Sequence, residues 1–184
     1  MKKYLITSRQ YYTDTPAVYR SILHERLREH LADFALYRDK FNPKYAEQAA
    51  HHVETCRQFE GVKPFIHQDV KLAHSLGADG VHLTSKQFDE IKKAKDLGLE
   101  AIVSTHTIEE LHMVKELCAD YATYSPIFPT PAKGEPKGIE GLKKALEEVD
   151  IKIFALGGVI SKKEVEALKE TDVYGFASIR YFYD

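Results

Sequence analysis

Short apolar runs alternate along this chain with longer segments in which apolar residues recur at helical spacing. The apolar runs predict strands at residues 4–7, 34–37, 65–67, 80–83, 101–103, 121–124, 151–156 and 175–179. The segments between them predict helices at 15–30, 42–59, 107–118, 139–149 and 161–171, and two more that end near 77 and at 97. Asn42, Thr107 and Ser161 stand where side chains that cap helices are expected.

This alternation predicts a single α/β domain over residues 1–184. Eight strand–helix units indicate a compact (β/α)8 TIM barrel, and an open doubly wound sheet is the alternative. Only residues 180–184 follow the eighth predicted strand, so we expect the last covering helix to be short or missing. A partner subunit would then cover that flank, which is why we expect a homodimer.

The charge and apolar content of the chain argue against nucleic acid and membranes as binding partners. The sequence has 26 basic and 28 acidic residues and a net charge of -2, a balance that favours neither nucleic acid nor an anionic membrane. No apolar run approaches the roughly 20 residues of a membrane span, and the first ten residues lack the apolar segment of a signal peptide. Cys56 and Cys118 lie far apart in separate helical patterns, so we expect a reduced, cytoplasmic protein.

The stretch from 121 to 138 combines a predicted strand with a stiff basic loop. Prolines at 126, 129, 131 and 136 fix the backbone and remove N–H donors, so this segment is a rigid loop and not a helix. Lys133 and Lys137 lie in it beside Gly134 and Gly138. Such a loop at a strand end suits the capture of an anion, most simply a phosphate. The alternative is a solvated, lysine-bearing loop.

The same loop resembles the signature loop of thiamine phosphate synthases and the related thiazole tautomerases, roughly GPIFPT-x-TK. Residues 126–130 and Lys133 match this pattern, whereas Ser125 replaces its glycine and Ala132 its second threonine. Other stretches agree in order and spacing, so the resemblance covers nearly the whole chain. It implies a barrel enzyme of thiamine biosynthesis that binds a small phosphorylated thiazole, with Thr130 and Lys133 among the substrate-binding residues.

Three of the nine histidines, His67, His82 and His106, lie at strand ends, where barrels build their active sites. His106 ends VSTH, which resembles the family's G-x-S-x-H stretch, and the resemblance implies proton transfer by His106 and a substrate contact by Ser104. An imidazole that titrates near neutrality can take and return a proton. A histidine that merely holds a loop is the alternative. We expect His67 to contact substrate and His82 to be structural, and either His67 or Tyr124 could assist the proton transfer.

The second predicted strand ends in a cationic pair, Arg38 and Lys40. Because side chains alternate along a strand, positions 36, 38 and 40 share one side. The pair resembles the family's Q-x-R-x-K element, with Leu36 in place of the glutamine. Both cations are therefore expected to bind the anionic groups of the substrate. The alternative is a surface salt-bridge cluster with Asp39.

Glycines near the last two predicted strand ends indicate a phosphate site. Gly157 and Gly158 in FALGGV resemble the family's AIGGI, and GFASI resembles its last phosphate-contacting segment. Glycine lets backbone N–H groups approach an anion closely, and barrels commonly bind phosphate after strands seven and eight. We expect Gly157, Gly158, Ser178 and Ile179 to bind phosphate, and either Ala177 or Arg180 completes the last segment. A tight turn is the alternative for the glycines.

The positions that bind metal in the synthases depart from the family pattern. The resemblance implies an Asn-Asp pair after the third strand and a further aspartate after GVHL, which together hold Mg²⁺. A gapless alignment puts His67 and Gln68 at the pair and Gln87 at the later position, while Asp69 falls one residue late. A slip of one residue would restore Asp69, so the synthase remains open.

Three hypotheses follow. The first is a metal-independent thiazole tautomerase with no cofactor, in which His106 moves one proton of a carboxythiazole phosphate. The second is a thiamine phosphate synthase that couples thiazole phosphate with the pyrimidine pyrophosphate and needs Mg²⁺. The third is a non-catalytic binder or regulator that takes a phosphorylated ligand.

Overall fold

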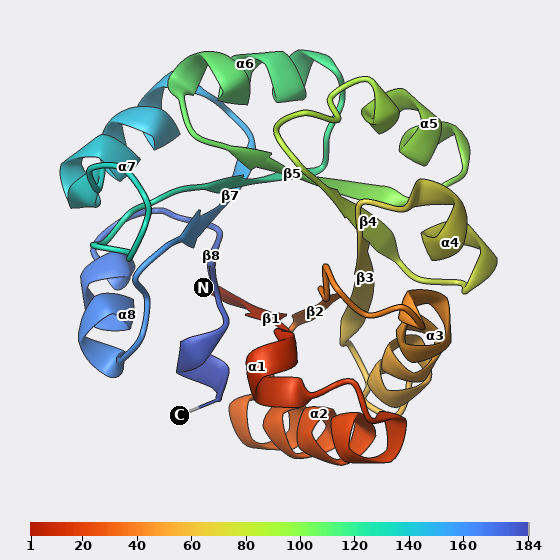
Figure 1. The fold of residues 1–184 in the computed structure, drawn as a ribbon. Coiled ribbons are helices and arrows are strands. Elements are labelled where there is room, and N and C mark those ends of the chain that lie inside the picture. The colour runs from red at the N-terminus through yellow and green to blue at the C-terminus, as the bar shows by residue number, and fades with distance from the viewer. Residues whose placement is uncertain (184) are drawn as a thin grey trace.

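Eight parallel strands form a closed barrel in sequence order (Figure 1). The structure is a computed structural model, and it describes residues 1–183. The strands are β1 (Lys2–Ile6), β2 (Phe34–Tyr37), β3 (Lys63–His67), β4 (Gly80–Leu83), β5 (Glu100–Thr105), β6 (Tyr121–Tyr124), β7 (Lys152–Leu156) and β8 (Gly175–Ser178). β8 pairs in parallel with β1, which closes the ring. The predicted TIM barrel is confirmed, and the open sheet is wrong.

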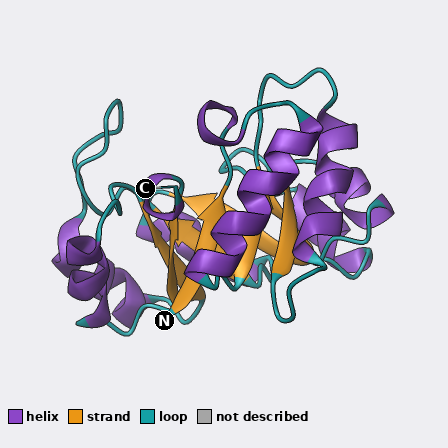
Figure 2. Cartoon of the chain, turned by 90° about the horizontal axis from the view of Figure 1, so that it is seen from below, coloured by secondary structure: helices purple, strands orange, loops and turns teal. Residues whose placement is uncertain are grey.

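Helices cover the outside of the barrel (Figures 1 and 2). They are α1 (Arg9–Tyr12), α2 (Pro16–His30), α3 (Tyr45–Cys56), α4 (Val70–Ser75), α5 (Glu90–Asp96), α6 (Ile108–Glu116), α7 (Gly138–Glu148) and α8 (Lys162–Lys169). The sequence did not predict the four-residue α1. Within residues 1–183, no helix is both long and apolar enough to cross a membrane.

Two of the three predicted helix caps are confirmed. Ser161 forms a complete capping box with Glu164 at the start of α8. The Thr107 hydroxyl accepts a hydrogen bond from the Glu110 N–H at the start of α6. The cap predicted for Asn42 is wrong, because the N-cap of α3 is Lys44. The Asn42 side chain instead accepts from the Lys44 N–H at 2.9 Å, in a turn before the helix.

Aromatic side chains fill the interior of the barrel. Tyr4, Phe34, Phe65, Phe154 and Tyr121 are almost fully buried there. Their ring centroids lie between 5.1 and 6.1 Å apart, in edge and tilted arrangements. The remaining apolar core packs between the outer faces of the strands and the helices. Packed rings inside the barrel leave space for a cavity only near its mouth.

A short 3-10 helix, η1 (Arg180–Phe182), follows β8 within the described residues. Phe182 is fully buried and stacks on Phe176, with 5.6 Å between ring centroids, and it also packs edge-on against His30 of α2. The expected short or missing last helix is therefore confirmed for residues 1–183. The aromatic residues of η1 cover part of the flank that such a helix would cover, and the homodimer stays a prediction.

Candidate active site

The carboxyl ends of the strands enclose a cavity of about 500 Å³. Every residue that the sequence predicts for the site lines it: Arg38, Lys40, His67, Ser104, His106, Thr130, Lys133, Gly157, Gly158, Ser178 and Ile179. The structure thus brings together side chains from the ends of most strands, as the barrel rule requires. Their roles toward a ligand remain predictions.

The charge of the cavity wall is positive. Arg38, Lys40, Lys133 and Arg180 line it, and no aspartate or glutamate of the described chain does. Burial is the main influence on the Arg38 guanidinium and lowers its pKa, yet arginine stays protonated in proteins. A wall that carries cations without carboxylates favours an anionic ligand.

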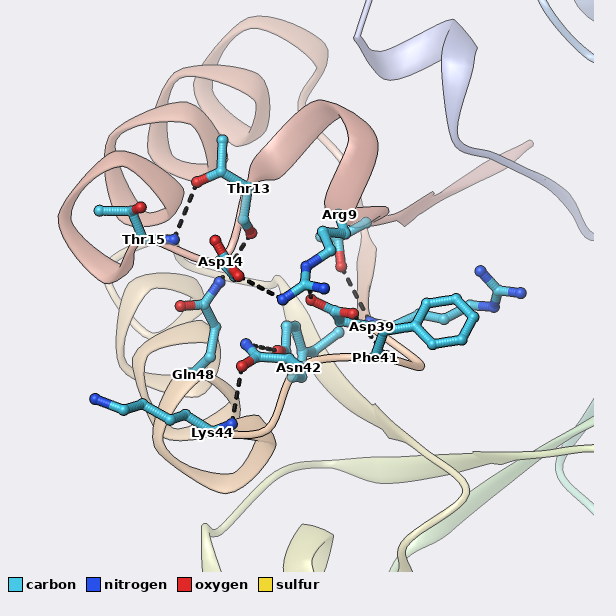
Figure 3. Close-up of polar contacts among 12 residues, drawn as sticks. Arg9, Thr13, Asp14, Thr15, Asp39, Phe41, Asn42, Lys44 and Gln48 are labelled. Atoms are coloured by element: carbon cyan, nitrogen blue, oxygen red, sulfur yellow. Dashed lines mark hydrogen bonds and ion pairs between the residues drawn. The ribbon is translucent and has the colours of Figure 1, made fainter.

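Asp39 does not line this cavity, and its carboxylate faces Arg9 of α1 (Figure 3). One of its oxygens lies 3.5 Å from Arg9 Nε, and the other accepts the Phe41 N–H at 3.0 Å. Arg9 also pairs with Asp14. Among the described residues, Asp39 forms no ion pair with Arg38, so the predicted salt-bridge cluster is wrong. This ion pair links α1 to the loop after β2 that carries Arg38 and Lys40, although the Asp39 oxygen that faces Arg9 accepts no hydrogen bond.

The glycine turn after β7 is shaped by the proline loop. Gly157 and Gly158 have φ of 98° and 69°, a region that favours glycine. A Cβ on Gly157 would lie 2.8 Å from Pro126 Cα, and one on Gly158 would lie 2.7 Å from the Pro129 oxygen. The Phe128 N–H also bonds the Gly157 carbonyl at 3.0 Å. Both glycines are therefore required for the loop to pack, which brings Lys133 to this end of the cavity.

The hydroxyl of Ser178 is already committed within the protein. It donates to the Val159 carbonyl at 2.7 Å and accepts the Tyr181 N–H at 3.2 Å. An anion at the ends of β7 and β8 would therefore meet backbone N–H groups and Arg180 before this hydroxyl. The phosphate contact predicted for Ser178 stays a prediction for its backbone only.

His106 has the geometry of a base. Its Nδ1 lies 3.2 Å from both the carbonyl oxygen and the hydroxyl of Ser125. The carbonyl can only accept, so a hydrogen bond to it requires the proton on Nδ1 and leaves the lone pair on Nε2, whereas the hydroxyl can also donate to Nδ1 in the other tautomer. The backbone N–H of His106 is held at 2.5 Å by the Glu110 carboxylate. The contacts to Ser125 and Glu110 thus orient the ring at the cavity wall.

The other two strand-end histidines are neutral. Burial, with Arg38 and Lys40 nearby, lowers the pKa of His67 to about 3, so it suits neither anion pairing nor proton transfer near neutrality. His82 is held between Tyr4 and Ser104, which agrees with the structural role expected for it. Tyr124 does not line the cavity, and it packs under the ammonium of Lys137, 4.9 Å from the ring centroid.

Sequence reasoning missed several residues of the cavity wall. They are Ser8, Gln10 and Tyr11, which follow β1, and Thr84 and Ser85, which follow β4. The signal that could have found them is their position alone, because each lies within five residues of the end of a strand.

The synthase resemblance implies Mg²⁺, but the side chains present do not fit it. Gln87 Oε1 accepts from the N–H and hydroxyl of Thr84 at 3.1 and 3.2 Å, and its Nε2 donates to the Gln68 carbonyl. The Asp69 carboxylate caps α4 by accepting the Leu72 N–H at 2.9 Å. Within residues 1–183, no three His, Cys, Asp or Glu side chains are grouped to hold a metal ion. Mg²⁺ demands an octahedron of oxygens, for which committed amides and a capping carboxylate are poor ligands.

The fold is a TIM barrel, and the cations that line its mouth favour an anionic ligand. A family model described as thiamine monophosphate synthase matches residues 3–182, and the chain belongs to this family. The resemblance of the loop sequence to this family is therefore confirmed.

Individual relatives agree. The thiamine-phosphate synthase of Bacillus anthracis (strain A0248) is 37% identical over 109 residues, which are 56% of this chain and 49% of that protein. A thiamine phosphate pyrophosphorylase from Pyrococcus furiosus superposes with a TM-score of 0.81 and 29% identity, over 97% of this chain and 85% of that one. An N-acetylmannosamine-6-phosphate 2-epimerase from Clostridium perfringens, at 11% identity and a TM-score of 0.75 over 98% and 87% of the chains, shares the fold alone.

The matched segment spans about half the length of the curated relatives. What those proteins do therefore comes to this chain only as a proposal. Their names describe a synthase, which is the second of the three hypotheses.

Proposed function

We propose that this chain isomerises a carboxythiazole phosphate of thiamine biosynthesis to its aromatic tautomer, without a metal ion. The observation that carries the proposal is that His106, four cations and the glycine turn line the same cavity at the barrel mouth. The phosphate binds the turn after β7 and the start of η1. Arg38 and Lys40 bind the carboxylate of the ring, and Lys133 closes over the phosphate end.

The reaction needs one mobile proton and no electron acceptor. His106 Nε2 takes a proton from one carbon of the thiazole ring system and returns it to another carbon of the same conjugated system. Substrate and product have the same formula, so one C–H bond breaks and one forms. The Ser125 carbonyl stabilises the imidazolium through Nδ1–H, and the cations stabilise the negative charge that develops on the substrate.

The names of the relatives support a different reaction from the tautomerisation proposed here. The names support a coupling of thiazole phosphate with the pyrimidine pyrophosphate, a reaction that the resemblance links to Mg²⁺. The hydrogen bonds of Gln87 and Asp69 oppose a magnesium site in this chain. Metal-free proton transfer is therefore our first proposal, and the synthase is the second candidate.

The test uses His106→Ala and, as a matched control, His112→Ala, which removes an exposed histidine from α6. A general base contributes about 10² to 10⁴-fold to a rate. We expect His106→Ala to lose tautomerisation by about this factor, because the proton has no acceptor, and to keep its affinity for thiazole phosphate. His112→Ala should match the wild type. An unchanged rate in His106→Ala would remove His106 from its role.

The second candidate is tested by incubating the chain with thiazole phosphate, the pyrimidine pyrophosphate and Mg²⁺. We expect no thiamine phosphate to form. Robust turnover would establish the synthase in place of the tautomerase. Saturable binding of thiazole phosphate without either reaction would support the non-catalytic binder.

A further inference from the structure

A chain of polar side chains runs through the barrel interior to the cavity wall. The Tyr4 hydroxyl from β1 lies 2.8 Å from His82 Nδ1 on β4, and His82 Nε2 lies 3.0 Å from the Ser104 hydroxyl on β5. Tyr4 is fully buried among phenylalanine rings, whereas Ser104 lines the cavity. His82 pairs in register with Ile102, so Ser104 lies two residues nearer the mouth.

The protons in this chain can be assigned from its ends. Burial raises the pKa of Tyr4 well above its usual value, so the phenol keeps its proton. Burial is also the main cause that lowers the pKa of His82 well below its usual value, so the imidazole is neutral and has one N–H. Within residues 1–183, His82 Nδ1 is the hydrogen-bond partner recorded for the phenol.

The phenol therefore donates to Nδ1, because the reverse arrangement would leave its proton buried without an acceptor. Nδ1 is then the unprotonated nitrogen, and Nε2–H donates to Ser104 Oγ. Since Ser104 accepts from His82, its own proton is free to be donated elsewhere.

A second Tyr–His pair shows why this arrangement is specific to His82. The Tyr19 hydroxyl lies 2.7 Å from His52 Nδ1, and His52 Nε2 lies 3.0 Å from the Ala35 carbonyl. A carbonyl only accepts, so Ala35 alone fixes the tautomer of His52. Ser104 can donate or accept, so Tyr4 is the group that fixes the tautomer of His82.

We propose that Tyr4 and His82 are positioning residues that make Ser104 an obligate hydrogen-bond donor to the ligand. The group that meets Ser104 must then be an acceptor, such as a carboxylate oxygen or an unprotonated ring nitrogen, and a protonated ring nitrogen is disfavoured. Only the identity of the ligand that Ser104 contacts rests on the proposed function. The proton arrangement itself is a property of the free protein.

The first measurement is ¹⁵N NMR of the histidine rings in the free wild-type protein. We expect His82 to be protonated at Nε2 and unprotonated at Nδ1. The opposite tautomer would overturn the relay, whatever the protein binds, so this result is separable from a failure of the proposed function.

The second measurement is a double-mutant cycle on the affinity for thiazole phosphate, which offers a ring nitrogen as acceptor. A neutral hydrogen bond is worth roughly 5-fold in affinity. Tyr4→Phe and Ser104→Ala should each lose about that factor, and the double variant should lose no more than Ser104→Ala alone. Tyr19→Phe, the matched control, should bind like the wild type. Additive losses would show that Tyr4 does not act through Ser104 and would overturn the proposal.

Discussion

Replacing Gly158 with alanine should destabilise the protein through the proline loop. Gly158 has a φ of 69°, where an alanine costs roughly 1–2 kcal/mol, and its Cβ would lie 2.7 Å from both Phe128 Cβ and the Pro129 oxygen. The side-chain and backbone shifts that the new Cβ forces lower the free energy of unfolding by about 1–3 kcal/mol more. The sum, about 2–5 kcal/mol, corresponds to a fall in Tm of roughly 4–20 °C, at about 2–4 °C per kcal/mol for a chain of this size.

The matched control is Gly98→Ala, in the connection between α5 and β5. Gly98 also has a positive φ, 75°, but nothing lies within 4 Å of the Cβ it would gain. Gly98→Ala should lower the free energy of unfolding only by the cost of a positive φ for alanine, roughly 1–2 kcal/mol. Thermal unfolding by circular dichroism compares the two, and inorganic phosphate binding measured at 15 °C on folded protein should fall for Gly158→Ala alone. Equal losses of Tm in the two variants would refute the packing of the loop on the glycine turn.

Further predictions concern the groups around the cavity. The pKa of His67 is about 3 in the folded protein, against about 6.5 in the unfolded chain. Its neutral form therefore contributes fully to the free energy of unfolding above pH 6.5, and this contribution falls by up to about 1.4 kcal/mol per pH unit as the pH drops toward 3. An NMR titration midpoint near 6.5 would contradict this. Arg9→Gln should raise KM several-fold with little change in kcat, because it leaves the buried Asp39 without its cation and loosens the loop that carries Arg38 and Lys40. An unchanged KM would show that Arg9 does not help to position this loop. Lys133→Ala should weaken thiazole phosphate binding more strongly at low salt than at high salt, whereas Lys144→Ala on α7 should not; equal salt dependence would argue against a phosphate contact.

The sequence predicted the barrel because its signals are local. Strands such as Phe34–Tyr37 and Gly80–Leu83 were predicted to the residue, and Ser161 with Glu164 marked a helix start within four positions. The strand-end rule and the family resemblance together then picked out many of the cavity residues, although not those that follow β1 and β4, without any contact information. The short α1 was missed because four residues carry no helical period.

Contacts between distant segments were not readable in this way. Asp39 follows Arg38 in sequence, but its partner is Arg9, thirty positions away and in an unpredicted helix. The link from Tyr4 through His82 to Ser104 crosses the barrel interior, so no spacing along the chain reveals it. The sequence also could not decide whether Asp69, shifted by one residue in the alignment, binds Mg²⁺. The structure shows that the carboxylate of Asp69 caps α4 instead.

The most direct test of the account is the metal dependence of the wild-type reaction. Carboxythiazole phosphate is incubated with the purified chain, with excess EDTA or with Mg²⁺, and the aromatic tautomer is followed by its ultraviolet absorbance. The account predicts equal rates under both conditions, and a rate that falls by about 10² to 10⁴-fold in His106→Ala. Conversion that requires Mg²⁺, or no conversion beside a Mg²⁺-dependent formation of thiamine phosphate, would contradict it.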